Sequence, residues 1–410
     1  MADMFGSGRI PVTEWHRLVI EDHLAERGEF FNLHHIVRLK DDVDFERFAA
    51  ALTCVYRSRE ATRARLAQDE SGEWFIYDSG VEFPAIQVEN FPAAAFDQLC
   101  AENDRAFRMT DSCFLRVRAT RVGGEAWLFM CFHHGFIDNV SYRAIIEEVV
   151  RAYEAPGWVP ESDGYFAWVR REHKVFAGRI GEEGRRFWTE RREKFSSWPH
   201  APRKDRDGSV DHSRDPQRHY FTLPFSGEAL AAAAARLGTS VFVLMAGAFV
   251  RAVAADHGSD RALLGWTCHG RNAKTRRMCG AFLRDYDIGI ETGGSVEDYL
   301  RRVRADLNAA MRHPYGYSYG RACYNDLDDD DLAFVNMRDE NATSSLFLDD
   351  PRARYGGLAD CSDMFELLLL HAGKTLSGKG FVKYMANYYS PARIADFLKG
   401  FFAELETLIA

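Results

Sequence analysis

The feature that most constrains the fold of this chain is an apolar run at residues 126–132, followed closely by a helical pattern from Val140 to Tyr153. The run predicts a strand and the pattern predicts a helix, so a short loop joins the end of the one to the start of the other. His133 and His134 stand at the predicted strand end, and Asp138 stands where the helix begins. Strand ends are rigid mounts for side chains, and the loops that follow them often carry functional sites.

These three side chains have a chemical and a structural interpretation. An imidazole has an unperturbed pKa near neutrality, which suits it to act as a general base. The two histidines can equally be a half-buried pair that closes the strand, and Asp138 is of a residue type that commonly caps a helix N-terminus. The residues by themselves leave both interpretations open.

The spacing of the three residues is also that of a known motif. His133-His134-x-x-x-Asp138 resembles the His-His-x-x-x-Asp-Gly motif (HHxxxD) of the condensation domains of nonribosomal peptide synthetases. It is similar, too, to the shorter motif of the wider chloramphenicol-acetyltransferase-like acyltransferase superfamily. Asn139 stands where the longer motif ends in Gly. Because Asn tolerates left-handed backbone angles better than most residues, we expect the turn to survive.

Two other segments of the first half carry the same resemblance. Residues 57–66 resemble the family's Arg-His-Glu-x-Leu-Arg-x-Arg-Phe motif and match it at Glu60, Arg63 and Arg65. The segment from Thr13 to Leu18 looks like a weak form of the family's first motif. The paired histidines follow residues 57–66 after about seventy residues, and this combination is hard to obtain by chance.

The second half carries two further segments of this kind. Residues 265–272 resemble the family's Gly-Arg-containing segment and also the Glu-Gly-His-Gly-Arg-Glu motif of the related epimerisation domains. Thr267 stands at the position of that motif's first Glu and cannot do the acid–base work of a carboxylate, which argues against epimerisation. Phe334-Val335-Asn336 resembles a late motif whose Asn lines a tunnel near the paired histidines. A strand Asn bonded to neighbouring backbone is the alternative interpretation of Asn336.

The order of predicted elements is similar in the two halves of the chain. Strands are predicted at residues 30–40, 64–68, 74–77, 114–122, 126–132, 219–223, 262–268, 282–290, 332–337, 363–371 and 380–389. Helices are predicted at residues 14–27, 44–55, 93–107, 140–153, 163–176, 184–195, 227–237, 240–255, 296–311 and 391–409. Two α/β halves of this kind suggest a pseudo-twofold arrangement with a site between them.

The resemblance covers nearly the whole chain and implies a particular α/β architecture. Two chloramphenicol-acetyltransferase-like lobes would form a V-shaped pseudo-dimer, with the reactive histidine in a tunnel between them. Residues 1–178 would be the N-terminal lobe with the HHxxxD motif, and residues 179–410 would be the C-terminal lobe. Five large side chains are candidates for lining the tunnel, with core packing as the alternative for each: Trp266, Met278, Phe282, Tyr286 and Met337.

Composition excludes several other classes of protein. A net charge of −9 argues against broad nucleic-acid binding, and no apolar run approaches the length of a membrane span. The N-terminus lacks the basic start and apolar core of a signal peptide. The eight cysteines form no Cys-x-x-Cys pair, so neither a metal site nor a disulfide framework is indicated. Together these features predict a cytoplasmic protein with reduced thiols.

A serine-hydrolase pattern occurs once, in the wrong context. Residues 316–320 fit Gly-x-Ser-x-Gly around Ser318, and Asp360 or Asp363 and His371 follow in hydrolase order. A nucleophile elbow needs a strand before it and a helix after it. A predicted long helix and His313-Pro314 precede this segment instead, so we do not favour a hydrolase.

The family resemblance assigns a role to each residue of the motif. His134 would be the base, or would orient the acceptor. His133 would be a packing residue, and Gly135 could offer its backbone N–H to the developing oxyanion. Asp138 would be structural and would hold the loop by pairing with Arg63. Asn336 would lie near the histidines.

The same resemblance implies a stand-alone condensation enzyme of natural-product biosynthesis. An acyl or aminoacyl thioester on the phosphopantetheine arm of a carrier protein would be attacked by an amine, or less often a hydroxyl, to form an amide or an ester. No Gly-Gly-[His/Asp]-Ser carrier motif or nucleotide loop occurs in the 410 residues, so we expect no bound cofactor and a donor supplied in trans. Coenzyme A is the alternative carrier of the acyl group.

A catalytically silent recruitment domain is the alternative from another class. Such domains keep the condensation fold, lose parts of the motif and dock other enzymes. Asn139 in place of Gly favours this alternative, whereas retention of both histidines and Asp138 argues against it.

Overall fold

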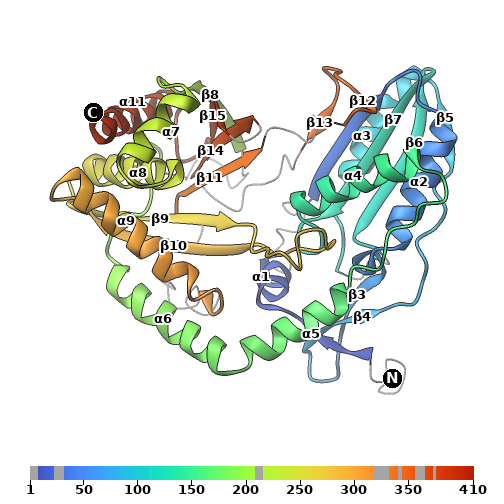
Figure 1. Ribbon diagram of the computed structural model, residues 1–410, viewed down its shortest axis with the longest axis horizontal. Helices are drawn as coiled ribbons and strands as arrows, with labels where there is room; N and C mark the ends of the chain where they lie inside the picture. Colours follow the sequence, from blue (N-terminus) through green and yellow to red (C-terminus); the bar gives the residue numbers. More distant parts are fainter. Residues whose placement is uncertain are drawn as a thin grey trace. The chain divides into compact units, whose positions relative to one another are not determined.

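The computed structural model describes residues 8–22, 32–109, 111, 113–207, 216–317, 332–339, 344–355, 365–372 and 375–410. The chain divides into two compact units (Figure 1). The first unit contains Met1–Gly178, His269–Leu283 and Asn341–Asp360, and the second contains Arg179–Cys268, Arg284–Glu340 and Cys361–Ala410. The sequence predicts two unbroken lobes that meet after residue 178. In the structure, the segments His269–Leu283 and Asn341–Asp360 also belong to the first unit. Ser318 of the hydrolase pattern lies outside the described residues.

A six-stranded sheet forms the centre of the first unit, as far as it is described. Its order is β12-β2-β7-β6-β5, with β13 also paired to β2. Only β5 and β6 are parallel in this sheet. The strands are β2 (Asn32–Leu39), β5 (Val88–Phe91), β6 (Leu115–Val122), β7 (Glu125–His133), β12 (Phe347–Leu348) and β13 (Arg354–Tyr355).

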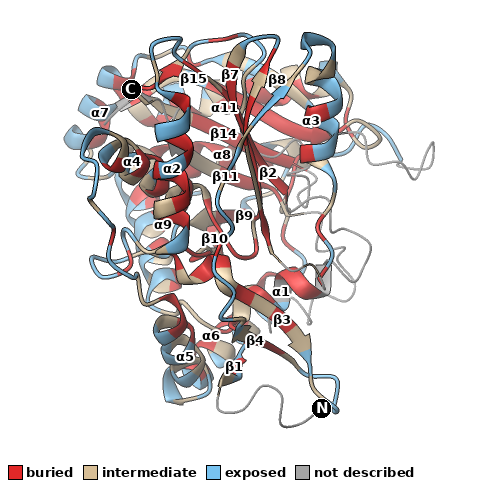
Figure 2. Ribbon diagram, turned by 90° about the vertical axis from the view of Figure 1, so that its right-hand side faces the viewer, coloured by how far each residue is buried: buried red, intermediate tan, exposed pale blue. Residues whose placement is uncertain are grey.

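Helices cover both faces of this sheet. The helices α2 (Phe45–Arg57) and α4 (Asn139–Glu154) pack together on one face, and α3 (Phe96–Asp104) packs on the other. The central strand β7 is therefore buried on both faces from residue 126 to 133, which explains why its apolar residues run without a break. Figure 2 shows how buried residues concentrate on the strands and on the helix faces turned toward them.

Smaller elements complete the first unit. A three-stranded sheet has the order β1-β4-β3. The remaining elements are β1 (Ile10–Pro11), α1 (Glu14–Asp22), η4 (Glu60–Arg63), β3 (Ala64–Gln68), β4 (Trp74–Asp78), η5 (Ala93–Ala95) and α5 (Tyr165–Phe176).

The second unit is built on another six-stranded sheet, of order β10-β9-β11-β14-β15-β8. The strand β11 is parallel to both of its neighbours, and the other pairs are antiparallel. The strands are β8 (Pro216–Thr222), β9 (Arg261–Cys268), β10 (Arg284–Glu291), β11 (Phe334–Asp339), β14 (Phe365–Ala372) and β15 (Thr375–Met385). The helices are α6 (Arg179–Phe195), α7 (Gly227–Arg236), α8 (Val241–His257), α9 (Val296–Met311) and α11 (Pro391–Ile409).

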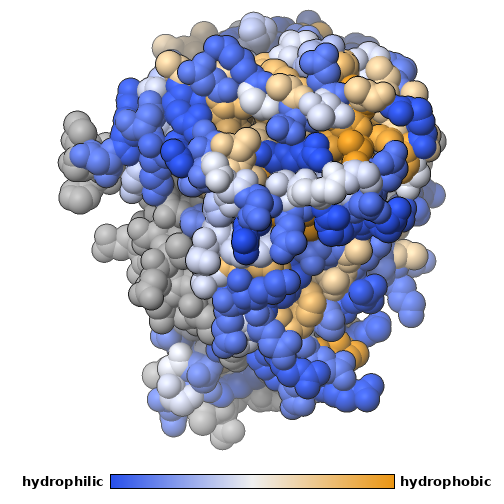
Figure 3. Space-filling view, turned by 90° about the vertical axis from the view of Figure 1, so that its left-hand side faces the viewer, coloured by the Kyte–Doolittle hydropathy of each residue, from blue (hydrophilic) through white to orange (hydrophobic). Residues whose placement is uncertain are grey.

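The helix α8 forms the middle of the core of the second unit. It packs against β9, α9 and α11, and its residues from Val243 to Val250 are buried. Among the described residues, no single helix is long and apolar enough to cross a membrane, and only α7 with α8, bent by 91°, passes that test as a pair. On the side where these helices lie, the surface is mainly hydrophilic, with patches of hydrophobic residues between the hydrophilic ones (Figure 3).

Short polar residues fix the starts of the helices. The side chains of Asp44, Ser240 and Ser390 each accept a hydrogen bond from the backbone N–H three residues further on, at the starts of α2, α8 and α11. Each bond satisfies one of the N–H groups that the first turn of a helix leaves without a partner. The predicted helix starts at these positions are confirmed.

The mixed α/β class is confirmed, and most predicted strands and helices are present. The prediction missed the very short strands β1, β12 and β13 and the edge strand β5. It also placed the last strand too late, since β15 ends at Met385 and a turn follows.

Candidate active site

The paired histidines lie at the junction of β7 and the loop to α4: His133 is the last residue of the strand, and His134 is the first residue of the loop. His133 is fully buried, and its ring lies between those of Phe107 and Phe114, with ring centres 6.0 and 5.6 Å away. The backbone N–H of Gly135 donates to its Nδ1 (3.2 Å), so this nitrogen carries no proton. His133 is thus a packing residue that fixes the loop from inside, in the place that the prediction gave it.

His134 is the half-exposed histidine of the pair. Its Nδ1 lies 3.4 Å from the carbonyl oxygen of Ile137, and because a carbonyl only accepts, this nitrogen carries the proton. Its Nε2 is then the basic nitrogen of the ring. The indole of Trp15 meets the imidazole edge to face, with ring centres 6.1 Å apart. In the neutral form of this tautomer, Nε2 is the nitrogen that can take a proton.

Asp138 is the N-cap of α4 and is 1% exposed. Its Oδ1 accepts from the backbone N–H of Ser141 (2.7 Å) and lies 2.9 Å from the hydroxyl of that residue. Its Oδ2 accepts from the backbone N–H of Phe282 (3.3 Å). Asp138 is therefore a helix cap, as the structural interpretation has it, and both of its carboxylate oxygens accept hydrogen bonds from the protein.

The cation that faces Asp138 is Arg271. Its Nη2 donates to Oδ1 of Asp138 (2.7 Å), and its Nη1 donates to the carbonyl oxygens of Thr275 and Met278, both at 2.7 Å. The guanidinium is 2% exposed and lies 4.0 Å above the ring of Phe282. One arginine thus joins the loop of the paired histidines to the segment His269–Leu283 of the first unit.

The predicted partner of Asp138, Arg63, is wrong. Arg63 donates through Nε and Nη2 to the carboxylate of Asp78 (3.0 and 2.9 Å). The reason is local, because Arg63 immediately precedes β3 and Asp78 lies opposite Ala64 on the neighbouring strand β4. The sequence did contain the signal for Arg271, which lies in the Gly-Arg-containing segment at residues 265–272.

Gly135 also differs from its predicted role. Its N–H was expected to face a developing oxyanion, but the buried side chain of His133 accepts it. A Cβ at this position would lie 2.7 Å from Cγ1 of Val19 and 3.0 Å from Nδ1 of His133. Gly135 is needed for close packing of the loop.

Asn139 replaces the Gly of the motif without backbone strain. It is the first helical residue of α4, after the extended backbone of Asp138 (φ −100°, ψ 169°). The turn survives as expected, but the left-handed conformation that motivated the expectation is not needed, since helical angles suit any residue here. The Asn139 side chain is half exposed.

Asn336 belongs to a polar row on the sheet of the second unit. Its Oδ1 accepts from the backbone N–H of Thr267 (2.9 Å), and its Nδ2 donates to Glu366 (2.7 Å). Glu366 in turn pairs with Lys383 (2.8 Å). These contacts agree with the alternative interpretation, a strand Asn that links neighbouring strands.

The side chains suggested for the tunnel lie in hydrophobic cores. Trp266 and Tyr286 are stacked, with ring centres 4.6 Å apart, in the core of the second unit, and Met337 packs against that core. Strand alternation explains the error, because Thr267 and Asn336, next to them in sequence, take the other face. In the first unit, Phe282 is 1% exposed, and Met278 packs against the core. Among the residues that the structure describes, no group of three or more His, Cys, Asp or Glu could hold a metal ion.

Comparison with known proteins gives one family. The chain matches the family model described as the condensation domain over residues 7–328. It is 23% identical over 304 residues to tyrocidine synthase 3 of Brevibacillus parabrevis, which covers 72% of this chain and 5% of that protein. The chain therefore spans only about one twentieth of the length of this curated relative.

Solved structures share the fold over almost the entire chain. One is the X-domain from teicoplanin biosynthesis, solved in complex with OxyB, with a TM-score of 0.79 and 16% identity over 98% of this chain and 93% of that chain. Another is the starter condensation domain of rhizomide synthetase, solved with a coenzyme A ligand, with a TM-score of 0.75 and 14% identity over 98% and 95%. At these identities the likeness shows the fold alone.

Proposed function

Because the chain belongs to the condensation-domain family, we propose that it joins an acyl or aminoacyl thioester to an amine or hydroxyl acceptor, as a stand-alone enzyme of natural-product biosynthesis. The observation that carries the proposal is the orientation and the exposure of the His134 ring. Its Nδ1 is tied to the carbonyl of Ile137, and its ring is half exposed on a loop that the Asp138–Arg271 pair holds. A base with a fixed tautomer and orientation is what the reaction requires.

In the proposed step, the acceptor nitrogen or oxygen attacks the thioester carbonyl while Nε2 of His134 takes its proton. A new C–N or C–O bond forms, the C–S bond breaks, and the proton passes from the imidazolium to the departing thiolate. A well-placed base contributes about 10²–10⁴ in rate. Positioning of the acceptor supplies much of the rest, because a thioester is already activated.

We propose a carrier protein as the source of the thioester, presented in trans on its phosphopantetheine arm. Membership of the condensation-domain family supports a carrier-bound donor. The rhizomide synthetase domain solved with a coenzyme A ligand makes a free coenzyme A thioester the second candidate.

A recruitment domain is the second candidate function. Two observations favour it: Asn139 in place of the motif Gly, and the similarity of the fold to an X-domain that was solved in complex with OxyB. The retained geometry of His134, Asp138 and Arg271 favours catalysis, since a surface that only docks another protein has no use for a base with a fixed tautomer.

The test is a product assay by mass spectrometry. The full chain is given carrier proteins from neighbouring genes, loaded with acyl groups, or the matching coenzyme A thioesters, together with a panel of amines and alcohols. We expect an amide or ester with wild type, a loss of at least about 100-fold with His134→Ala, and no loss with His173→Ala on α5. An equal product yield from wild type and His134→Ala would remove His134 from the chemistry. No product from any pair, with tight binding of a tailoring enzyme, would favour recruitment.

A further inference from the structure

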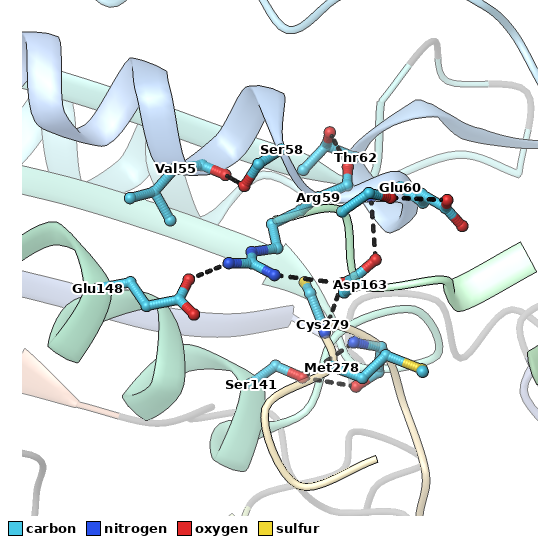
Figure 4. A network of polar contacts seen from close by, with 12 residues as sticks. Val55, Ser58, Arg59, Glu60, Thr62, Ser141, Glu148, Asp163, Met278 and Cys279 are labelled. Carbon is cyan, nitrogen blue, oxygen red and sulfur yellow. Dashed lines mark hydrogen bonds and ion pairs between the residues drawn. The ribbon is translucent and has the colours of Figure 1, made fainter. Parts of the chain in front are cut away.

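A buried arginine, Arg59, holds together three parts of the first unit. Its side chain is 4% exposed and pairs with Glu148 of α4 (Figure 4). Its Nη1 lies 3.8 Å from Oδ2 of Asp163, in the segment that leads into α5. Arg59 occupies the position of the His in the Arg-His-Glu motif that residues 57–66 resemble, so the family pattern gave no reason to single it out.

Asp163, which Arg59 contacts, also binds the backbone of the segment His269–Leu283. Its Oδ2 accepts from the N–H of Cys279 (2.8 Å), and its Oδ1 accepts from the N–H of Glu60 (3.4 Å). The side chain is 3% exposed, so these bonds are shielded from water. Figure 4 shows Asp163 between Arg59 and Cys279.

The next residue, Gly280, contacts the loop of the paired histidines. Its carbonyl oxygen accepts from the backbone N–H of Asp138 (3.2 Å) and lies 2.7 Å from the hydroxyl of Ser141. Its own N–H donates to that hydroxyl (3.0 Å). The two residues Cys279 and Gly280 therefore form a bridge between Asp163 on one side and the loop that carries His134 on the other.

The packing around the bridge leaves little room for movement. A Cβ on Gly280 would lie 2.7 Å from Cε2 of Tyr165, which begins α5 two residues after Asp163. Tyr165 is fully buried, and its hydroxyl lies 3.0 Å from Nε2 of His16. A small shift of Asp163 would thus have to be transmitted to Gly280.

Charge explains why an arginine is needed at position 59. Burial raises the pKa of both Glu148 and Asp163. A neighbouring carboxylate adds to each rise: Asp163 for Glu148, and Glu60 for Asp163. The guanidinium of Arg59 acts in the opposite direction and lowers the pKa of both carboxyl groups, and the N–H groups that donate to Asp163 lower the pKa of Asp163 as well. A planar guanidinium can face two carboxylates at once, which an ammonium group does poorly.

We propose that Arg59 is a positioning residue: by holding Asp163 it fixes the Cys279–Gly280 bridge, and the bridge fixes the Asp138 loop that orients His134. Its effect on catalysis rests on the proposed function. Its effect on the bridge does not.

A merely structural arginine would behave differently, and the chain offers a matched example. Arg191 of the second unit is 8% exposed and also faces two carboxylates, with Nη2 2.6 Å from Asp306 and Nε 3.5 Å from the fully buried Asp287. Its hydrogen bonds to Asp287 and Asp306 stay within the second unit. Arg191→Lys is therefore the control for the cost of disturbing a buried ion triad.

The experiment measures amide hydrogen exchange and kinetics of the full chain for wild type, Arg59→Lys, Asp163→Ala and Arg191→Lys. We expect exchange in residues 278–282 to be about 10- to 100-fold faster in the first two variants, and unchanged in Arg191→Lys. We expect kcat to fall about 10-fold or more in the same two variants, with KM for the acceptor nearly constant. Arg191→Lys should lower the melting temperature but not kcat.

Two results would overturn the proposal. One is unchanged exchange at residues 278–282 in both Arg59→Lys and Asp163→Ala. The other is an equal loss of kcat in Arg191→Lys at the same melting temperature. If Asp163→Ala does not fold, Asp163→Asn takes its place, because it removes the charge that Arg59 holds and keeps one acceptor oxygen. If wild type forms no product, the proposed function fails, and the exchange data still decide whether Arg59 controls the bridge.

Discussion

Replacement of Arg271 by Met should destabilise the first unit far more than replacement of Arg63. The guanidinium of Arg271 is 2% exposed and donates to Asp138, to the carbonyl oxygens of Thr275 and Met278 and, at 3.1 Å, to that of Gly280. Removing one partner of a buried ion pair costs about 3–5 kcal/mol, because the remaining charge keeps its desolvation penalty. Asp138 would retain its bonds from Ser141 and Phe282, which favours the lower end of that range.

The control is Arg63→Met, which breaks a partly exposed pair with Asp78. Such a pair contributes about 0–1 kcal/mol. Unfolding in urea is monitored by tryptophan fluorescence and by circular dichroism. The double variant Arg271→Met/Asp138→Asn, compared with its two single variants, completes a double-mutant cycle. We expect the double variant to be less destabilised than the sum of the single variants. Equal costs for Arg271→Met and Arg63→Met, within about 0.5 kcal/mol, would refute the assignment of Arg271 as the partner of Asp138.

Four further predictions follow from single positions. Gly135→Ala should cost about 1–3 kcal/mol by overpacking the loop, measured by urea unfolding, and should reduce product formation. Trp266→Ala should cost about 3–5 kcal/mol as a core truncation, and a panel of acceptors should show no change of preference in the folded fraction. Hydrogen bonding from Arg352 lowers the pKa of Asp350 in the folded state. The carboxylate therefore adds stability that is fully present above its unfolded pKa of about 3.9 and is lost as the pH falls through the lower folded-state pKa. The stability difference between wild type and Asp350→Asn should be constant near neutral pH and decrease progressively below about pH 3.9. Burial raises the pKa of Cys131 to about 12, so iodoacetamide at pH 8 should leave this thiol unmodified in the native protein, as peptide mass spectrometry would show.

The elements that could be predicted from the sequence are those with a strong local pattern. The run at 126–132 has no polar interruption, and Asp138 and Ser240 are capping residues placed directly before helical periodicity. Such signals depend on neighbours along the chain. The strands β12 and β13 have two residues each and no periodicity, and they exist only because β2 offers an edge on which they pair. Nothing local distinguishes them from a loop.

The site was predictable in its residue types and only partly in its contacts. His133, His134 and Asp138 lie in one short loop, so their geometry follows from the strand end and the helix start. The partner of Asp138 is 133 residues away. Arg63 and Arg271 are equivalent as charges, and only the fold decides which of them reaches the carboxylate.

The prediction of the residues that line the tunnel was wrong for a related reason. Large apolar residues on a strand are expected both in a core and in a substrate pocket, and sequence alone does not say which face of the strand is which. In β9 and β11 the apolar Trp266 and Met337 take the side of the core, and the polar Thr267 and Asn336 take the other. Any side chains of this sheet that meet a substrate are therefore to be sought among the polar residues of that second face.

Asn139 differs from the Gly of the motif by the volume of its side chain and not by its backbone conformation. Its backbone is helical, its neighbour Asp138 caps the helix as an Asp should, and the Arg271 pair is intact. The substitution thus leaves the loop of the paired histidines in place and adds an amide side chain beside it. The Asp138–Arg271 pair would stabilise the fold of a silent recruitment domain as well as that of an enzyme, because Arg271 also binds the carbonyl oxygens of Thr275 and Met278. The product assay with His134→Ala, rather than the ion pair, therefore separates catalysis from recruitment.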